Sequence, residues 1–346
     1  MTNPLLVLAW LVLAHLTSDF LLQTGAIARA KSGSGRRALA GLMAHGLIVA
    51  ACLIPVGLAY GDPGWMFLAL TALSHAAIDR AKVLLTRRAA AAALAEAHRR
   101  HEGPQPSDHL GRAWTPRPAA LFLLDQAAHL VVATILWAIL LVPSSPVAGW
   151  TSTIDGWLGT WDRAVVHDVV SAAVVLASLA IVNILAAALF VAILVRPVEQ
   201  AEGAMRGGSR VAAPGAPEES PRAWPAPIRR WSLRVGSIEA ARIVADPETA
   251  SQARAGPEPS VQARPPATAR VGATIGVLER ILIVVFVLTG SEAAIGFVVA
   301  AKTLARFRLL DDRDFAEYYL LGTLSSVAVA IVTALIARAA LAVLLS

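Results

Sequence analysis

Three pairs of histidine and aspartate residues lie in apolar stretches of the sequence, and the two members of each pair are four positions apart. The pairs are His15 with Asp19, His75 with Asp79, and Asp125 with His129. Residues with this spacing share one face of an α-helix, so each pair presents an imidazole and a carboxylate to the same side. A further apolar stretch adds His45.

Imidazole nitrogens and carboxylate oxygens are the protein ligands of zinc and similar divalent ions. A water molecule bound to such an ion can act as a nucleophile in hydrolysis. The pattern therefore predicts a divalent metal, such as zinc, as cofactor. The candidate metal ligands are His15, His45, His75 and His129. The candidate catalytic residues, acting as ligands or general bases, are Asp19, Asp79 and Asp125.

The composition indicates that membrane-spanning helices hold these residues. Hydrophobic residues make up 56% of the 346 residues and charged residues 16%, against roughly 45–50% and about 25% in soluble domains. The apolar residues form long runs with few charges, and a bilayer span needs about 20 such residues. The predicted fold class is all-α, a polytopic transmembrane helix bundle of about eight spans.

The apolar runs divide the chain into three parts. Residues 1–199 form a predicted five-helix membrane module, with spans near 4–23, 38–60, 64–86, 118–142 and 166–195. Residues 200–273 are rich in Pro, Ala and Arg and are predicted to be a mostly disordered cytoplasmic linker. Residues 274–346 form a three-helix module, in which Gly290 and Ser291 divide the first part into a hairpin of two short helices.

Basic residues in the loops predict the orientation, because they remain on the cytoplasmic side. They follow the first and third spans, whereas the loop 143–165 carries tryptophans and aspartates and fits the outer surface. This topology places both termini outside and all seven candidate residues in the cytoplasmic half of the bilayer. Each lipid-facing aspartate would cost about 2.5–3.5 kcal/mol near a helix centre, so the polar groups are expected to face one another.

Two other functions fit the same residues. The cluster could relay protons or bind a cation in a transporter, or it could be a polar seam that only sets helix packing. For a single pair, packing is the simpler explanation; the coincidence of all seven at one depth favours a function. Glu279, Arg280 and Asn183 are expected to pair within the bundle in a structural role.

Several other functions find no support in the sequence. It has no phosphate-binding glycine loop, dinucleotide fingerprint, nucleophile elbow or helical zinc-protease motif. The formal net charge of +6 is explained by the inner loops and requires no nucleic acid. Membrane lipid is the expected partner, and no protein partner is indicated.

Ordered motifs resemble a known family in both membrane modules. In the first module they are His15–Gln23, His45–Gly46, His75–Asp79 and Leu124–Leu130; in the second they are Ile275–Arg280, Ala294–Phe297, Ala300–Phe307 and Ala316–Thr323. Together they are similar to the bacterial membrane family called domain of unknown function 3307. The resemblance implies a multi-pass protein of the bacterial inner membrane. It implies no activity and no catalytic or binding residue.

Overall fold

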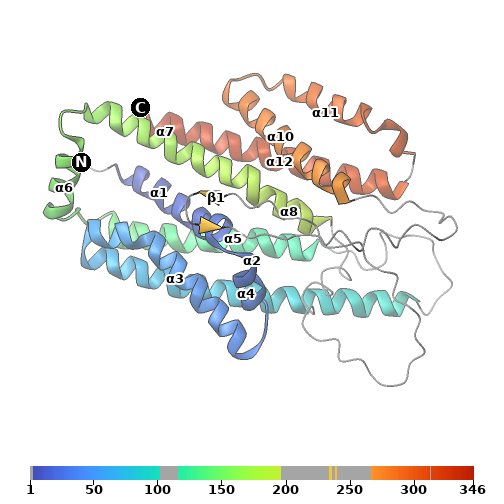
Figure 1. Cartoon of the computed structure of the whole chain (residues 1–346), viewed down its shortest axis with the longest axis horizontal. Helices are drawn as coiled ribbons and strands as arrows, with labels where there is room; N and C mark the ends of the chain where they lie inside the picture. Colours follow the sequence, from blue (N-terminus) through green and yellow to red (C-terminus); the bar gives the residue numbers. More distant parts are fainter. Residues whose placement is uncertain (1–2, 102–115, 196–233, 236–237, 240–265, 312) are drawn as a thin grey trace. The chain divides into compact units, whose positions relative to one another are not determined.

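The computed structural model describes residues 3–101, 116–195, 234–235, 238–239, 266–311 and 313–346 (Figure 1). The chain divides into two compact units, one of Met1–Gly208 with Gly276–Ser346 and one of Ser209–Ile275. The described residues are almost entirely helical. The exception is an antiparallel pair of two-residue strands in the second unit, β1 (Arg234–Val235) and β2 (Ile238–Glu239).

Between residues 3 and 195, the part that the structure describes forms eight α-helices. They are α1 (Pro4–Leu16), α2 (Gly25–Lys31), α3 (Gly35–Tyr60), α4 (Asp62–His101), α5 (Arg117–Leu136), α6 (Ala148–Leu158), α7 (Arg163–Ile181) and α8 (Ala187–Leu194). Short π-helical segments continue three of the spans. These segments are Thr17–Leu22 after α1, Trp137–Leu141 after α5, and Val182–Ala186 between α7 and α8.

Three α-helices are described within residues 266–346. They are α10 (Pro266–Leu288), α11 (Ala294–Leu304) and α12 (Arg313–Leu344), with a 3₁₀ turn at Phe307–Leu309. Gly290 has a φ of +71°, a backbone conformation that glycine adopts without strain, and it ends the first arm of the predicted hairpin. The sequence-based division at Gly290 and Ser291 therefore matches the structure. At 11 residues α11 is about 16 Å long, well short of a bilayer core of about 30 Å.

Five helical stretches are long and apolar enough to cross a membrane, which indicates a membrane protein. They are Pro4–Leu22, Gly35–Tyr60, Arg117–Leu141, Arg163–Leu194 and Phe315–Leu344. Among the described residues α4 is not one of them; Asp79, Arg80 and Lys82 lie along it. The count of about eight spans therefore stays a prediction.

Two helix boundaries differ from the sequence-based expectation. Helix α4 runs to His101, well past the predicted end at residue 86, because the alanine-rich sequence that follows is strongly helix-forming. Helix α10 begins at Pro266, inside the predicted linker, and proline is favoured in the first turn of a helix. Most of the predicted disordered linker lies outside the described residues, and the three-part division of the chain stays a prediction.

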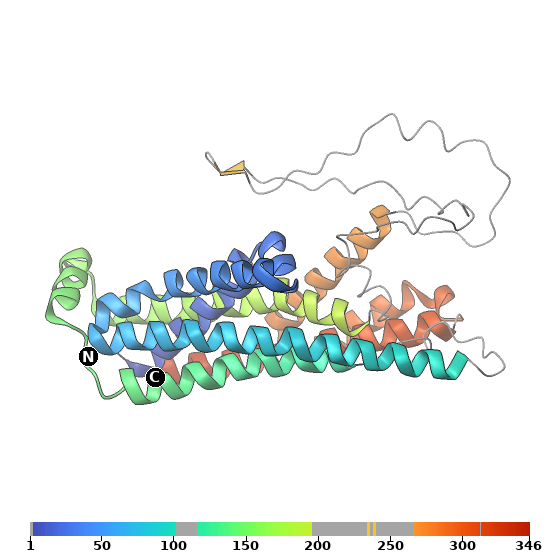
Figure 2. The ribbon, with the colours of Figure 1, turned by 90° about the horizontal axis from the view of Figure 1, so that it is seen from below.

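Within the first unit the long helices lie side by side. Helix α4 packs between α3 and α5, and α1 contacts α3, α5 and α7 (Figures 1 and 2). Helix α12 packs on α7 and α8. Ile283 and Val287 of α10 also bury themselves against Ala330 and Ala334 of α12. The chain from Gly276 onward is thus packed into the same compact unit as helices α1–α8.

Helix α2 is held tightly against α3 and α4. A Cβ atom on Gly41 of α3 would lie 2.5 Å from the backbone nitrogen of Lys31, so only glycine permits this approach. Arg87 of α4 donates to the carbonyl of Ser32 and, across 3.0 Å, to that of Gly33. These contacts fix the end of α2 beside the middle of α4.

Candidate metal centre

The structure brings all seven sequence-predicted residues together in the first unit. His15 and Asp19 come from α1 and its π-helical continuation, His45 from α3, His75 and Asp79 from α4, and Asp125 and His129 from α5. Every one of these side chains is at most 10% exposed, and that of His45 is fully buried. The cluster therefore lies inside the bundle and is shielded from lipid.

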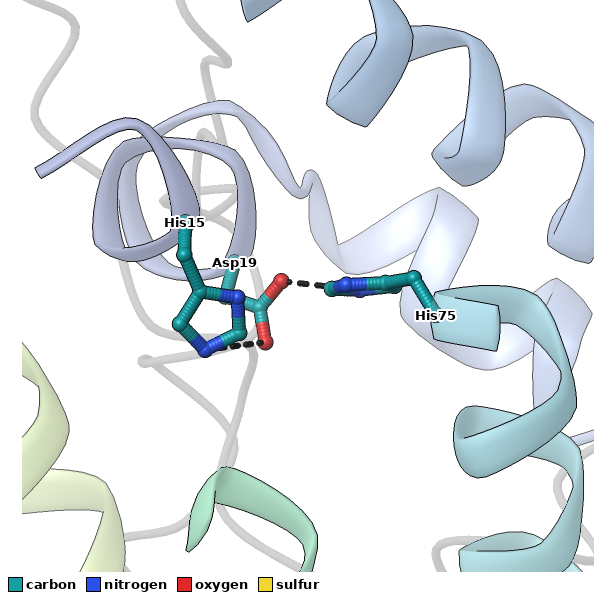
Figure 3. A group of neighbouring side chains, drawn as sticks. All are labelled: His15, Asp19 and His75. Carbon is teal, nitrogen blue, oxygen red and sulfur yellow. Dashed lines mark ion pairs between the residues drawn. The ribbon is translucent and has the colours of Figure 1, made fainter. Parts of the chain in front are cut away.

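The π-helical segment positions Asp19. Ser18, which is fully buried, donates its hydroxyl to the carbonyl of His15 across 2.8 Å. A π-helical turn changes the direction in which its side chains point and frees backbone carbonyls, and such turns occur frequently at functional sites. Asp19 lies between His15 and His75 and presents one carboxylate oxygen to each (Figure 3).

Three ligand atoms form a tight triangle. The Nε2 atoms of His45 and His75 lie 2.9 Å apart, and each lies 3.2 Å from Oδ1 of Asp19. A neutral imidazole carries one N–H, so in a hydrogen bond between the two Nε2 atoms one donates and the other is unprotonated, which leaves no second N–H for the carboxylate at this corner. A cation at the face of the triangle would satisfy all three atoms at once.

The dimensions of the triangle fit a small divalent ion. Zinc bonds to imidazole nitrogen and carboxylate oxygen are about 2.0–2.2 Å long, so the ligands of a tetrahedral site lie roughly 3.3 Å from one another. The observed separations of 2.9–3.2 Å are close to that value. The three residues fit a metal without rearrangement of their helices.

His15 is the nearest candidate for a fourth ligand. One ligand atom each from His15, Asp19 and His75 lie within 4.8 Å of one another. The Nε2 atom of His15 is 4.0 Å from Oδ2 of Asp19 and 3.3 Å from Oε1 of Gln126. The amide of Gln126 also donates to Oδ2 of Asp19 across 3.2 Å. Gln126 thus orients both His15 and Asp19.

His129 has different surroundings. Its Nδ1 lies 2.8 Å from the backbone carbonyl of Asp125, and its Nε2 lies 3.4 Å from that of His75. Its ring centroid is 4.0 Å from that of His75. Ligand atoms of His129, Asp79 and Asp125 also lie within 4.8 Å of one another, but both of these carboxylates bind lysines. His129 is therefore placed to support His75.

Two lysines neutralise two of the three carboxylates. Lys31 of α2 binds Asp79 across 2.5 Å, and Lys82 of α4 binds Asp125 across 2.7 Å. With neutral imidazoles, three carboxylates and two ammonium groups leave one net negative charge among these residues. Asp19 is the carboxylate that faces histidines instead of a lysine. The uncompensated charge thus lies on the group at the corner of the histidine triangle.

A small cavity adjoins the cluster. It is about 20 Å³ and is lined by His15, His75 and His129 together with apolar side chains such as Leu53 and Phe67. A cavity of this size holds about one water molecule. A water molecule here would lie beside the same histidines that face Asp19.

Sequence reasoning missed two members of the cluster. It assigned Lys31 to a cytoplasmic loop, because nothing in the local pattern indicates that α2 packs against α3. Gln126 lies within the motif around Asp125 and was given no role of its own, although a glutamine inside an apolar span is itself a signal of hydrogen bonding between helices. Lys82 lies seven residues after His75 on α4, and the structure pairs it with Asp125 of the neighbouring helix.

The model of a family described as "Protein of unknown function (DUF3307)" matches residues 7–157, which include all seven clustered residues. No curated protein matches the chain, and no solved structure does.

Proposed function

We propose that this chain, which belongs to the DUF3307 family through its residues 7–157, binds a divalent metal inside the membrane and uses it for hydrolysis. The metal is zinc or an ion of similar preference, held by His45, His75 and Asp19 with His15 as fourth ligand. The observation that carries the proposal is the triangle of Nε2, Nε2 and Oδ1 atoms with edges of 2.9–3.2 Å. The family description supplies no activity, so the proposal rests on this geometry.

The setting of the proposed site is a multi-pass protein of the bacterial inner membrane with about eight spans. The five apolar helical stretches support it; in this proposal α4 and α10 supply two further spans, and α11, which is too short to cross the whole bilayer core, enters it as the second arm of the hairpin. Under the orientation expected from loop charges, the metal lies in the cytoplasmic half of the bilayer. The protein then acts on groups that reach it from the cytoplasmic leaflet.

The residues around the metal have distinct roles in this proposal. His45, His75, His15 and Asp19 bind the ion, and Gln126 orients Asp19. Lys31 and Lys82 neutralise Asp79 and Asp125, which keeps those carboxylates from competing for the ion. A catalytic zinc needs a position for water, so the water would be a fifth ligand beside these four; when bound, the metal would lower the pKa of that water and so supply a hydroxide nucleophile near neutral pH. The cavity beside His15 and His75 has room for that water.

Metal content of the purified full-length protein tests the first half of the proposal. Wild-type protein is expected to carry about one zinc or other transition-metal ion per chain, measured by inductively coupled plasma mass spectrometry. His45→Ala and His75→Ala should each lose it. His167→Ala is the matched control, because His167 is partly exposed and contacts Asp168 away from the cluster. Metal-free wild-type protein that also fails to bind added zinc would contradict the proposal.

Turnover measurements test the proposed hydrolysis. Metal-loaded protein in detergent is expected to hydrolyse fluorogenic phospholipid esters, and chelation of the metal should stop the reaction. After chelation, wild-type protein should regain activity when zinc is added back, whereas His75→Ala should not. Bound metal without hydrolysis of lipid or soluble esters would argue against the catalytic role and leave only the binding role.

A second candidate function is proton-coupled or cation transport. The observation that favours it is a continuous polar chain from Asp19 through Gln126 and Asp125 to Lys82, whose side chain is 28% exposed. Such a chain can relay protons between the buried cluster and the cytoplasmic side. Metal-free protein that acidifies the lumen of liposomes, with the activity lost in Asp19→Asn, would favour transport over hydrolysis.

A further inference from the structure

A second polar cluster lies in the first unit, away from the histidines, where α10 and α12 meet the π-helical segment Val182–Ala186. Arg280 of α10 is only 3% exposed. It donates through Nε to the backbone carbonyl of Asn183 across 2.6 Å and through Nη1 to the hydroxyl of Ser326 across 3.0 Å. The sequence predicted that Glu279, Arg280 and Asn183 pair within the bundle, without naming their partners, and the structure places Arg280 against the backbone of Asn183.

Arg280 forms no ion pair with a carboxylate among the residues that the structure describes. Its neighbour Glu279 binds Lys302 of α11 across 2.5 Å. Among the described residues no acceptor lies within hydrogen-bond distance of the Nη2 atom of Arg280, which is buried. A buried guanidinium with an unsatisfied N–H group is costly in a low-dielectric interior unless an anion binds it.

A second buried hydrogen-bond donor without a described partner lies on α12. Tyr319 is 6% exposed, and its hydroxyl has no partner in the described part of the chain. Tyr319 and Ser326 are seven residues apart, which places them on one side of the helix about 10 Å apart along its axis. Tyr319 therefore lies on the same face of α12 as Ser326, whose hydroxyl accepts from Arg280 of α10.

Positive charge surrounds this face. The ammonium of Lys302 lies 5.8 Å from the centre of the Tyr319 ring, and the guanidinium carbon of Arg306 lies 6.0 Å from it. With Arg280 these make three cations, and Glu279 is the carboxylate bound to Lys302. The net charge of these four groups is +2. Under the expected orientation this face is near the cytoplasmic surface, where anionic headgroups lie.

We propose that Arg280 and Tyr319 bind a phosphate-type anion, with Lys302 and Arg306 supplying the surrounding positive field. An arginine side chain is well suited to phosphate because its planar guanidinium offers several N–H groups, and phosphate oxygens accept several hydrogen bonds from different directions. The phosphate comes either from an anionic phospholipid headgroup or from free phosphate. The site is separate from the histidine cluster, so the proposal does not depend on the proposed metal.

Thermal unfolding of the full chain in neutral detergent tests this site, followed by intrinsic tryptophan fluorescence. Added phosphatidylglycerol is expected to raise the unfolding temperature by several degrees more than added phosphatidylcholine. If inorganic phosphate alone produces the shift, the source is free phosphate; if phosphatidylglycerol alone does, the source is the headgroup. Equal shifts with both lipids and none with phosphate would overturn the proposal.

Variants test whether the shift in unfolding temperature comes from binding at Arg280 and Tyr319. Arg280→Gln should abolish it, and Tyr319→Phe should reduce it while keeping the packed ring. Arg338→Gln is the matched control, because Arg338 lies on α12 but is half exposed and paired with Glu292. Tyr319→Phe decides the question if Arg280→Gln fails to fold. If Arg280→Gln or Tyr319→Phe folds and still shows the full wild-type shift, binding at this site is refuted.

Discussion

Lys31 lies 2.5 Å from Asp79, and this ion pair joins the end of the short helix α2 to the middle of α4. The aspartate is 2% exposed and the lysine side chain 10%. Asp79 is four residues from His75 on the same helix and 3.8 Å from its Nε2 atom. The pair therefore neutralises a carboxylate next to the proposed metal ligands.

Removal of Lys31 should destabilise the protein strongly. Lys31→Met leaves Asp79 buried without its partner, and breaking one side of a buried ion pair costs about 3–5 kcal/mol. The free energy of unfolding in detergent, measured with a denaturant series, checks this. Lys82→Met should cost less, about 1 kcal/mol, because Lys82 is 28% exposed and water reaches its end of the pair with Asp125.

The double variant Lys31→Met with Asp79→Asn separates pairing from packing. If the loss comes from the uncompensated carboxylate, the double variant should recover much of the stability lost in Lys31→Met. Additive losses in the two single variants would show instead that Lys31 and Asp79 act independently.

The sequence could predict the histidine and aspartate pairs because their geometry is local. A spacing of four places His75 and Asp79 on one helix face whatever the rest of the fold does. The apolar runs likewise predicted the long helices, and Gly290 predicted the break between α10 and α11. The metal and catalytic roles of the paired residues remain predictions, as does the full span count.

The contacts between distant segments could not be predicted in the same way. Lys31 and Asp79 are 48 positions apart, and their contact depends on how closely α2 approaches α3. The π-helical turn at Asp19 is also invisible to a spacing rule, since it arises where tertiary packing overrides the regular helical register. One sequence supplies periodicity but no direct signal for such pairings.

A methyl group on Gly41 should displace α2. In Gly41→Ala the added Cβ would lie 2.5 Å from the backbone nitrogen of Lys31 and 2.8 Å from Ala30, which is too close for real contacts. We expect a loss of about 1–3 kcal/mol in unfolding free energy, as for other overpacked interiors. The measurement is the denaturant series used for Lys31→Met.

Gly46→Ala is the matched control on the same helix. Nothing lies within 4 Å of a Cβ atom added there, so the substitution should be neutral or stabilising by about 0.5–1 kcal/mol. Equal losses at both glycines would mean that the close approach of α2 has no special role.

Gln126 should affect metal affinity without binding the metal. It donates to Asp19 and to Asp125 and faces Nε2 of His15. Loss of such outer partners typically weakens metal binding 10–100-fold. We expect Gln126→Leu to raise the zinc dissociation constant by about that factor in competition with a fluorescent chelator. Gln23→Leu, whose buried Oε1 accepts no hydrogen bond among the described residues, should leave affinity near that of wild type.

Acidification should release the proposed metal. Histidine binds zinc through an unprotonated nitrogen, so protons compete with the ion and the slope of log affinity against pH counts the protons displaced. With His15, His45 and His75 as ligands, the slope should approach about three at acidic pH and fall to about two in His15→Ala. Isothermal titration of zinc at several pH values, in buffers of different ionisation enthalpy, measures both the affinity and the proton release. A pH-independent affinity would mean that zinc binds elsewhere, through carboxylates that are already ionised.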